Sequence, residues 1–295
     1  MDTISKSERS RGFILLFATI LFFSTYEVVN KMMGGRIDPF QINFIRFFVG
    51  GAMLLAVAAV KRELTISPRD FALCALAGGL NVVVSMSLIN ASLSLPGSSA
   101  AVTAVLFSCN PVFVSIFAAL IDGERIGPRK VIALALGIAG TVIISLKPLM
   151  ASMGGAGGAG VLLGPTLTVL SALAFGFYTV VGKRISGRIG SLRMNGYAFL
   201  TGSFMLVPFL LATGRPLFAF DLSVAPHVAY LSIFMTGIAY LIYFRGLGIL
   251  GAGKGSLVFF LKPVLATAFA VLLLGESIDA TVIGGMALIL VAVGL

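Results

Sequence analysis

Two positively charged side chains stand inside otherwise apolar stretches of this 295-residue chain. Lys262 directly precedes Pro263 in the run KPVLATAFAVLLLGE (262–276), and Arg46 lies in the run INFIRFFVGGAMLLAVAAV (42–60). A cation inside an apolar helix costs about 2.5–3.5 kcal/mol on membrane-insertion scales, so it must face water, a partner or a bundle interior. We expect Lys262 to offer its charge to a carboxylate or phosphate of a substrate. The alternative is that it pairs with a backbone carbonyl or snorkels to the membrane surface.

Two prolines interrupt the apolar stretches at matching places. Pro111 and Pro263 each lack a backbone N–H and push against the carbonyl four residues earlier, so each predicts a kink or hinge in a helix. The carbonyls freed in this way belong to Phe107 and Phe259, and in lipid each needs a partner or a wet cavity. Asn110 precedes the first proline, as a lysine precedes the second, and adds a polar group at this depth.

Further polar and aromatic side chains fall at a similar depth in neighbouring apolar stretches. The expected substrate-binding set is Lys262, Asn110, Asn81, Ser85, Ser99, Thr103, Tyr240, Tyr243, Phe107 and Phe259. Taken singly, each serine or threonine is better explained by packing between helices. As a set they favour a moderately polar pocket with aromatic walls.

Acidic side chains are scarce within the apolar stretches. Glu27 is the only acid well inside one, and it stands four residues before Lys31, where the two can form a helical ion pair. Glu27, Lys31 and Arg46 are therefore candidates for ion coupling or for a structural ion pair. The scarcity of buried acids favours facilitated diffusion or exchange over a proton relay.

The remaining chemical motifs do not predict an enzyme, a metal site or a cofactor. The runs GLGILG (246–251) and GILGAGKG (248–255) resemble nucleotide-binding turns, but they lack the strand and helix that such motifs require. Cys74 and Cys109 form no CxxC pair, and the sole histidine, His227, has no cluster of ligands around it. We expect no cofactor and no metal.

The elements that position these residues are membrane helices. Hydrophobic residues make up 58% of the chain, charged residues 11%, and the mean hydropathy is +1.08. Apolar stretches of about 20 residues recur along the whole sequence, each long enough to cross a bilayer. We predict an all-α integral membrane protein with ten transmembrane helices, at 12–32, 38–60, 70–92, 97–120, 129–147, 162–185, 192–213, 224–246, 253–274 and 279–295.

The basic residues that give the chain its net charge of +10 lie mainly in alternate connections between these helices, on the side of the N-terminus. This asymmetry indicates that both termini are cytoplasmic. It also explains the charge by membrane topology, so we expect no nucleic-acid partner.

The sequence repeats itself at an offset of 152 residues. YEVVNK (26–31) falls on YTVVGK (178–183), and NPVFVSIFAALIDGERI (110–126) falls on KPVLATAFAVLLLGESI (262–278), in one ungapped register. Proline, Gly-Glu, tyrosine and lysine recur at equivalent places, which shared apolar residues alone would not produce.

The repeat predicts two five-helix halves, 1–147 and 162–295, joined by a linker at 148–161 that contains GGAGGAG. Because five is odd, the second half must enter the membrane from the opposite side. Inverted repeats around a central cavity are typical of transporters, since the two halves can exchange roles and open a site to each face in turn. Duplication without transport is the alternative.

The two proline motifs, PVFVSIFAALIDGE and PVLATAFAVLLLGE, together with Arg46-Phe47, resemble the drug/metabolite transporter superfamily. More narrowly, the chain is similar to its ten-helix bacterial exporters of amino acids and other metabolites, including aromatic amino acid exporters. The resemblance implies a central cavity between the third, fourth, eighth and ninth spans, and export across the inner membrane. The chain departs from the family in having IDGE where Leu-Gly-Glu is common and in having no tryptophan. Glu124 and Glu276 are expected to be loop or helix-capping residues.

These observations predict a secondary transporter that exports small metabolites, amino acids including aromatic ones, by alternating access. Its partners would be a small-molecule substrate and the lipid bilayer of a bacterial inner membrane; a monomer is compatible with the sequence. A sugar-phosphate or nucleotide-sugar carrier of the same fold is the main alternative, and it would need more cavity charge than one or two residues supply. A membrane enzyme on lipid-linked substrates should show clustered acids or histidines, and a structural membrane subunit would have no use for buried cations.

Overall fold

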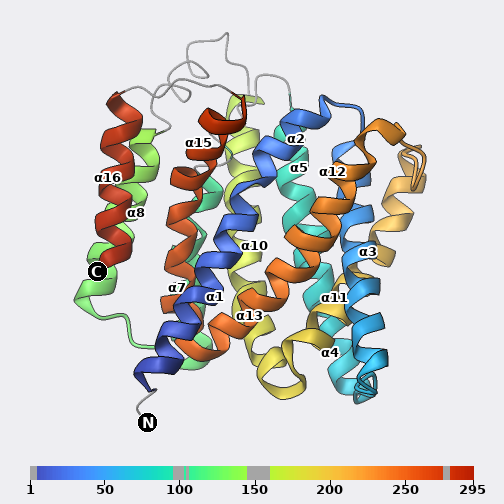
Figure 1. Cartoon of the computed structure of the whole chain (residues 1–295), viewed down its shortest axis with the longest axis horizontal. Helices are drawn as coiled ribbons and strands as arrows, with labels where there is room; N and C mark the ends of the chain where they lie inside the picture. Colours follow the sequence, from blue (N-terminus) through green and yellow to red (C-terminus); the bar gives the residue numbers. More distant parts are fainter. Residues whose placement is uncertain (1–4, 96–102, 104–105, 145–159, 275–279) are drawn as a thin grey trace.

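The computed structural model describes residues 5–95, 103, 106–144, 160–274 and 280–295, and these residues form helices and no strand (Figure 1). Seven helical stretches are long and apolar enough to cross a membrane: Lys6–Met33, Pro39–Val60, Pro68–Ser94, Leu163–Ile189, Ser191–Ala212, Leu222–Leu250 and Ala252–Leu273. Two shorter apolar helices, Leu106–Asp122 and Ala280–Gly294, and the 17-residue helix Pro128–Ile144 coincide with the other predicted spans. The predicted all-α membrane fold is confirmed.

Several spans are made of consecutive helical segments of different winding. The elements are α1 (Lys6–Ser24), α2 (Tyr26–Met33), α3 (Pro39–Val60), α4 (Pro68–Gly78), η1 (Gly79–Ser85), α5 (Met86–Ser94), α7 (Asn110–Asp122), α8 (Pro128–Ile144), α10 (Gly160–Ile189), α11 (Ser191–Ala212), η2 (Leu222–Val224), α12 (Ala225–Tyr230), η3 (Leu231–Ile238), α13 (Ala239–Leu250), α14 (Ala252–Gly255), η4 (Ser256–Phe260), α15 (Leu261–Leu274) and α16 (Ala280–Gly294). Most of the predicted linker 148–161 lies outside the described residues, and α10 already begins at Gly160.

Local sequence signals set the helix ends. Asp38 caps α3, where its side chain accepts from the backbone N–H groups of Phe40 and Gln41, and Pro39 occupies the first turn. Ser67 caps α4 in the same way, again just before a proline. Gly34 ends α2 in the left-handed conformation at φ 58°, which glycine adopts without steric penalty.

Two π-helical stretches lie within the third and eighth spans. η1 begins at Gly79 and η3 at Leu231, so their starts are 152 residues apart, the same offset as the sequence repeat. Asparagines at equivalent positions of the two repeats bond to these spans: the Asn43 amide donates to the Val82 carbonyl at 3.1 Å, and the Asn195 amide to the Tyr240 carbonyl at 3.3 Å. π-helical turns often mark functional segments of membrane helices.

The packing of the helices has the exchange symmetry that inverted repeats predict. α3 packs on α11, and α8 packs on α16, each pair joining equivalent helices of the two halves. α1 packs on α13 and α15, as α10 packs on the α4–η1–α5 span and on α7. α1 and α10 run in opposite directions; α1 starts at the end of the bundle where the N-terminus lies, and α16 runs towards that end (Figure 1). We call this end the terminus-bearing end.

Glycines allow the closest of these helix contacts. A Cβ on Gly78 would lie 1.9 Å from the Ala198 carbonyl oxygen, so α4 and α11 touch backbone to backbone. A Cβ on Gly285 would lie 2.6 Å from the Gly140 carbonyl oxygen, where α8 and α16 meet. Small residues at such crossings are the usual means of packing helices in membranes.

Candidate functional site

A cavity of about 460 Å³ lies between the two halves of the bundle, within the range typical of small-molecule sites. Its wall comes from α1, α2, α3, α5, α10, η3, α13, η4 and α15. The wall includes the exposed residues Lys31, Gly35 and Pro39, so the cavity reaches the end of the bundle opposite the termini. Aromatic and aliphatic side chains make up most of the wall.

Four phenylalanines at repeat-equivalent positions form its inner part. Phe175 is the equivalent of Phe23, and Phe259 is the equivalent of Phe107. Phe23 packs on Phe259 with ring centroids 5.8 Å apart, and Phe175 packs on Phe107 at 5.4 Å. Phe175 and Phe259 also touch each other, at 5.5 Å. Among the described residues, no ring contact joins the equivalent pair Phe23 and Phe107. The four rings therefore occupy symmetric positions, but only one of the two equivalent pairs, Phe175 with Phe259, is in contact among the described residues.

Beyond the joined side, the interior is filled towards the terminus-bearing end. Tyr178, Tyr243 and Phe244 are at most 1% exposed. Tyr178 packs on Phe175, which lines the cavity, and on Phe244. Neither Tyr178 nor Phe244 lines the cavity itself, so these rings fill the space between the cavity and the terminus-bearing end. The cavity is thus closed on this side by buried aromatic rings.

A hydrogen-bonded ion cluster closes the same end nearer the surface. The Glu124 carboxylate accepts from the backbone N–H groups of Ala252 at 2.9 Å and Gly253 at 3.0 Å, and from Lys183 Nζ at 3.1 Å. Asp122 accepts from the same lysine at 2.9 Å and from Arg184 Nε at 2.5 Å. The cluster ties the end of α7 to α10 and to the turn between α13 and α14. We call it the Glu124 cluster.

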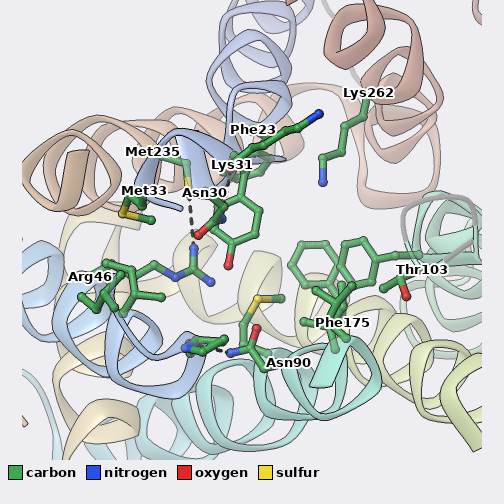
Figure 2. A pocket seen from close by; sticks show the side chains of 18 of the residues that line it. Phe23, Asn30, Lys31, Met33, Arg46, Asn90, Thr103, Phe175, Met235 and Lys262 are labelled. Carbon is green, nitrogen blue, oxygen red and sulfur yellow. Dashed lines mark hydrogen bonds between the residues drawn. The ribbon is translucent and has the colours of Figure 1, made fainter. Parts of the chain in front are cut away.

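Three cations line the cavity: Lys31, Arg46 and Lys262. Figure 2 shows Arg46 and Lys262 reaching towards the middle from different sides. The Lys262 ammonium lies 5.9 Å from the centroid of the Phe107 ring. No acidic side chain lines the cavity among the residues whose side chains are described.

The model of the EamA-like transporter family matches this chain at residues 10–146 and 162–295. The chain belongs to the EamA-like transporter family. It is therefore a multi-pass membrane transporter rather than an enzyme, and the resemblance to the drug/metabolite transporters is confirmed at this level.

Relatives of this EamA-like protein match nearly all of the chain. An uncharacterized transporter of Clostridium kluyveri is 34% identical over 287 residues, which cover 95% of this chain and 91% of the relative. A WAT1-related chloroplastic protein of Arabidopsis thaliana is 26% identical over 306 residues, covering 95% and 68%. A protein solved by crystallography shares the fold, with a TM-score of 0.80, 21% identity, and coverage of 97% and 96%.

The EamA-like cavity brings together part of the site expected from sequence. From that set it is lined by Lys262, Thr103, Tyr240, Phe107, Phe259, Lys31 and Arg46. Ser99 lies outside the described residues. Glu27 belongs to α2, but its side chain lies outside the described part of the structure.

Other residues of the expected site lie buried outside the cavity wall. Asn110 is fully buried, and its amide donates to the Phe107 carbonyl at 3.0 Å, so it satisfies a carbonyl that the proline leaves free. Ser85 exchanges hydrogen bonds with Ser171 of α10, which is a packing contact between helices. Asn81 and Tyr243 are also fully buried, Tyr243 within hydrogen-bonding distance of a threonine hydroxyl on α10.

The two prolines each begin a helix. Pro111 lies in the first turn of α7, after a turn at Cys109, and Pro263 lies in the first turn of α15, after the 3-10 segment η4. In both spans the regular α-helical winding is interrupted just before the proline, where the missing N–H leaves a carbonyl without its helical partner. The irregular backbone just before each proline keeps a hinge at these positions as a prediction.

Several residues of the wall were missed by the sequence analysis. They are Phe23, Tyr26, Asn30, Asn90, Phe175 and Met235. Phe23 and Phe175 are 152 residues apart and precede the matched tyrosines of the repeat by three residues, so the self-alignment contained a signal for both. Asn30, Asn90 and Met235 have no such signal.

Proposed function

We propose that this EamA-like transporter is a secondary carrier that exports small metabolites, chiefly amino acids including aromatic ones, by alternating access. The observation that carries the proposal is the one-sided aromatic set. Phe175 and Phe259 meet in the cavity wall, whereas no ring contact joins their repeat equivalents, Phe23 and Phe107, among the described residues. If the two halves exchange conformations, the joined pair opens as the separated pair closes.

The chemistry of the cavity supports this substrate class. The phenylalanine rings and Tyr240 offer a surface for an apolar or aromatic body, and Lys262 and Arg46 offer positive charge to a carboxylate. Asn30, Asn90 and Thr103 add neutral polar groups on the wall. A volume of about 460 Å³ suits a molecule the size of an amino acid.

The distribution of basic residues supports an inner-membrane protein with both termini in the cytoplasm. In that orientation the cavity opens outward, and the Glu124 cluster closes the cytoplasmic end. The lack of an acid among the described side chains of the cavity wall supports facilitated diffusion or exchange over proton coupling.

A sugar-phosphate carrier is the second candidate, because three cations line the cavity where the sequence alone had suggested one or two. The apolar wall opposes it, since a sugar body would leave hydroxyls facing phenylalanine rings without hydrogen bonds.

Proteoliposomes test the proposal. Radiolabelled amino acids and sugar phosphates are offered with and without a pH gradient, to the wild type and to Lys262→Met. We expect amino acid flux independent of the gradient, and its loss in Lys262→Met at an unchanged melting temperature. Flux of sugar phosphates without any amino acid flux would replace the proposal with the second candidate.

A further inference from the structure

Arg46 is the most deeply buried cation in the wall of the cavity. The residue is 1% exposed, it lies about two turns into α3, and its guanidinium points towards the other lining side chains (Figure 2). At the equivalent position of the second repeat α11 carries Ala198, which is buried as well. The architecture that the two halves share therefore does not depend on a cation at this place.

Among the residues whose side chains are described, the partners of the Arg46 guanidinium are all neutral. One terminal nitrogen contacts the Met235 sulfur at 3.2 Å and the other donates to the Asn43 side-chain oxygen at 3.2 Å. The rings of Phe47 and Tyr26 lie 4.4 Å and 5.2 Å from the guanidinium carbon. The Nε atom is buried and has no hydrogen-bond partner.

This arrangement holds the guanidinium in place but leaves its charge uncompensated. A guanidinium carries five N–H donors in a rigid fork, and a thioether is a weak acceptor. Aromatic rings stabilise a cation, but less than an anion in direct contact does. A buried charge without a counter-ion is strongly destabilising, and an ionisable side chain within a membrane span is by default a candidate for a functional site.

We propose that Arg46 anchors the carboxylate of the substrate and that this carboxylate, rather than an amino group, decides what the cavity accepts. The inference rests on the proposed function and narrows its substrate class to small organic anions with an aromatic or branched apolar body. The anion takes the guanidinium N–H donors that Met235 and Asn43 leave unused, and the body lies against Phe23, Phe107 and Tyr240. Amino acids enter through the same carboxylate contact.

The wall offers an ammonium group much less than it offers a carboxylate. Among the described side chains, the possible acceptors for an ammonium are the neutral oxygens of Asn30, Asn90, Thr103, Tyr26 and Tyr240, and none is a carboxylate. A neutral oxygen near three cations is a poor site for a fourth positive charge. We therefore expect the order organic acid, then zwitterion, then amine.

A probe series with one constant ring tests this order. Purified protein in nanodiscs is titrated by calorimetry with 3-phenylpropionate, phenylalanine and phenethylamine. We expect 3-phenylpropionate to bind at least tenfold more tightly than phenylalanine, and phenethylamine to bind not at all or about a hundredfold more weakly than the acid, since loss of a buried charge contact is worth several kcal/mol.

Variants of Arg46 assign the preference to this residue. Arg46→Met should weaken 3-phenylpropionate at least tenfold and leave the weak binding of phenethylamine unchanged or stronger. Arg46→Lys, which keeps the charge but loses the two-pronged geometry, should fall between. Lys61→Met, an exposed lysine at the terminus-bearing end, removes the same charge and should bind as the wild type does.

The outcomes separate the two proposals. Equal binding of acid and amine, or wild-type affinity of a folded Arg46→Met, overturns the role of Arg46 while phenylalanine flux in proteoliposomes keeps the proposed function. If Arg46→Met does not fold, the wild-type probe series and Arg46→Lys decide: the inference is wrong if the acid has no advantage over the amine, or if Arg46→Lys equals the wild type. No binding of any probe and no amino acid flux overturns both proposals.

Discussion

Loss of the Glu124 carboxylate should open the terminus-bearing end of the molecule. Its two oxygens join α7 to α14 through the N–H groups of Ala252 and Gly253, and to α10 through Lys183. Glu124→Gln keeps the size of the side chain but turns one acceptor into a donor. That donor would then face an N–H group or the lysine ammonium, neither of which can accept its proton.

The expected effect can be estimated from these bonds. A hydrogen bond to a charged group contributes about 1.5–3 kcal/mol when it is buried. The Glu124 side chain is 22% exposed, so solvent weakens each contact. Together the bonds should be worth about 2–3 kcal/mol, or roughly 30- to 150-fold in the equilibrium between closed and open forms. An open form present at about 1% in the wild type would rise to about a quarter or more.

Distances between spin labels measure this shift directly. Gly127, after the cluster in sequence, and Gly248, at the end of α13, are exposed, and a Cβ on either meets no atom within 4 Å. Cysteines at these two positions, with Cys74 and Cys109 replaced by alanine, carry the labels across the closure. The wild type should give one short distance, and Glu124→Gln should add a longer one.

Glu63→Gln is the matched control, because Glu63 is exposed at the same end of the bundle and belongs to no described ion pair. Its distance distribution should equal that of the wild type. If Glu124→Gln gives only the short distance while its melting temperature is unchanged, the Glu124 cluster does not hold this end closed, and the reasoning is wrong.

Three further changes follow from the packing. Gly285→Leu should lower the melting temperature, since overpacking costs about 1–3 kcal/mol and a Cβ there would lie 2.6 Å from a backbone oxygen of α8. The neighbouring Gly284→Leu has open space around it and should leave the melting temperature unchanged. Equal melting temperatures of the two variants would contradict the packing. Ser85→Ala should cost about 1 kcal/mol of stability with transport retained, since its partner is Ser171; a loss of transport at unchanged melting would give Ser85 a functional role. The last change uses cysteines in place of Phe23 and Phe107, in the background without native cysteines. They should cross-link faster when Glu124→Gln is added, because opening of the terminus-bearing end should bring this pair together. An unchanged rate would argue against coupling between the two ends.

Much of the fold could be predicted from the sequence because the bilayer leaves few choices. Apolar length selects helices, and prolines and caps at Asp38 and Ser67 place their starts within a few residues. The repeat register paired Phe107 with Phe259, which both line the cavity, but the equivalent pair Phe23 and Phe175 was missed. The winding of η1 and η3 had no such signal, because π-helical turns depend on packing and on bonds such as that from Asn43 to Val82.

The candidate site was predictable where charge or symmetry marked it, and not elsewhere. Lys262 and Arg46 stood out because cations are rare in apolar helices, and both line the cavity. Asn110 stood out for the same polarity, but its amide bonds to the Phe107 carbonyl, a contact that only the folded turn before Pro111 creates. Sequence polarity shows that a group needs a partner; it does not show whether the partner is a ligand or the backbone.

The cavity thus combines two kinds of residue with different relations to the repeat. Its phenylalanines occur in equivalent pairs, Phe23 with Phe175 and Phe107 with Phe259, and residues shared by both halves can serve a movement in which the halves exchange roles. Its buried arginine occurs once, opposite an alanine. A substrate has one carboxylate and binds in one orientation, so the residue that holds it need not be duplicated. In the proposed mechanism the paired rings therefore serve the movement, and the single cation serves the substrate.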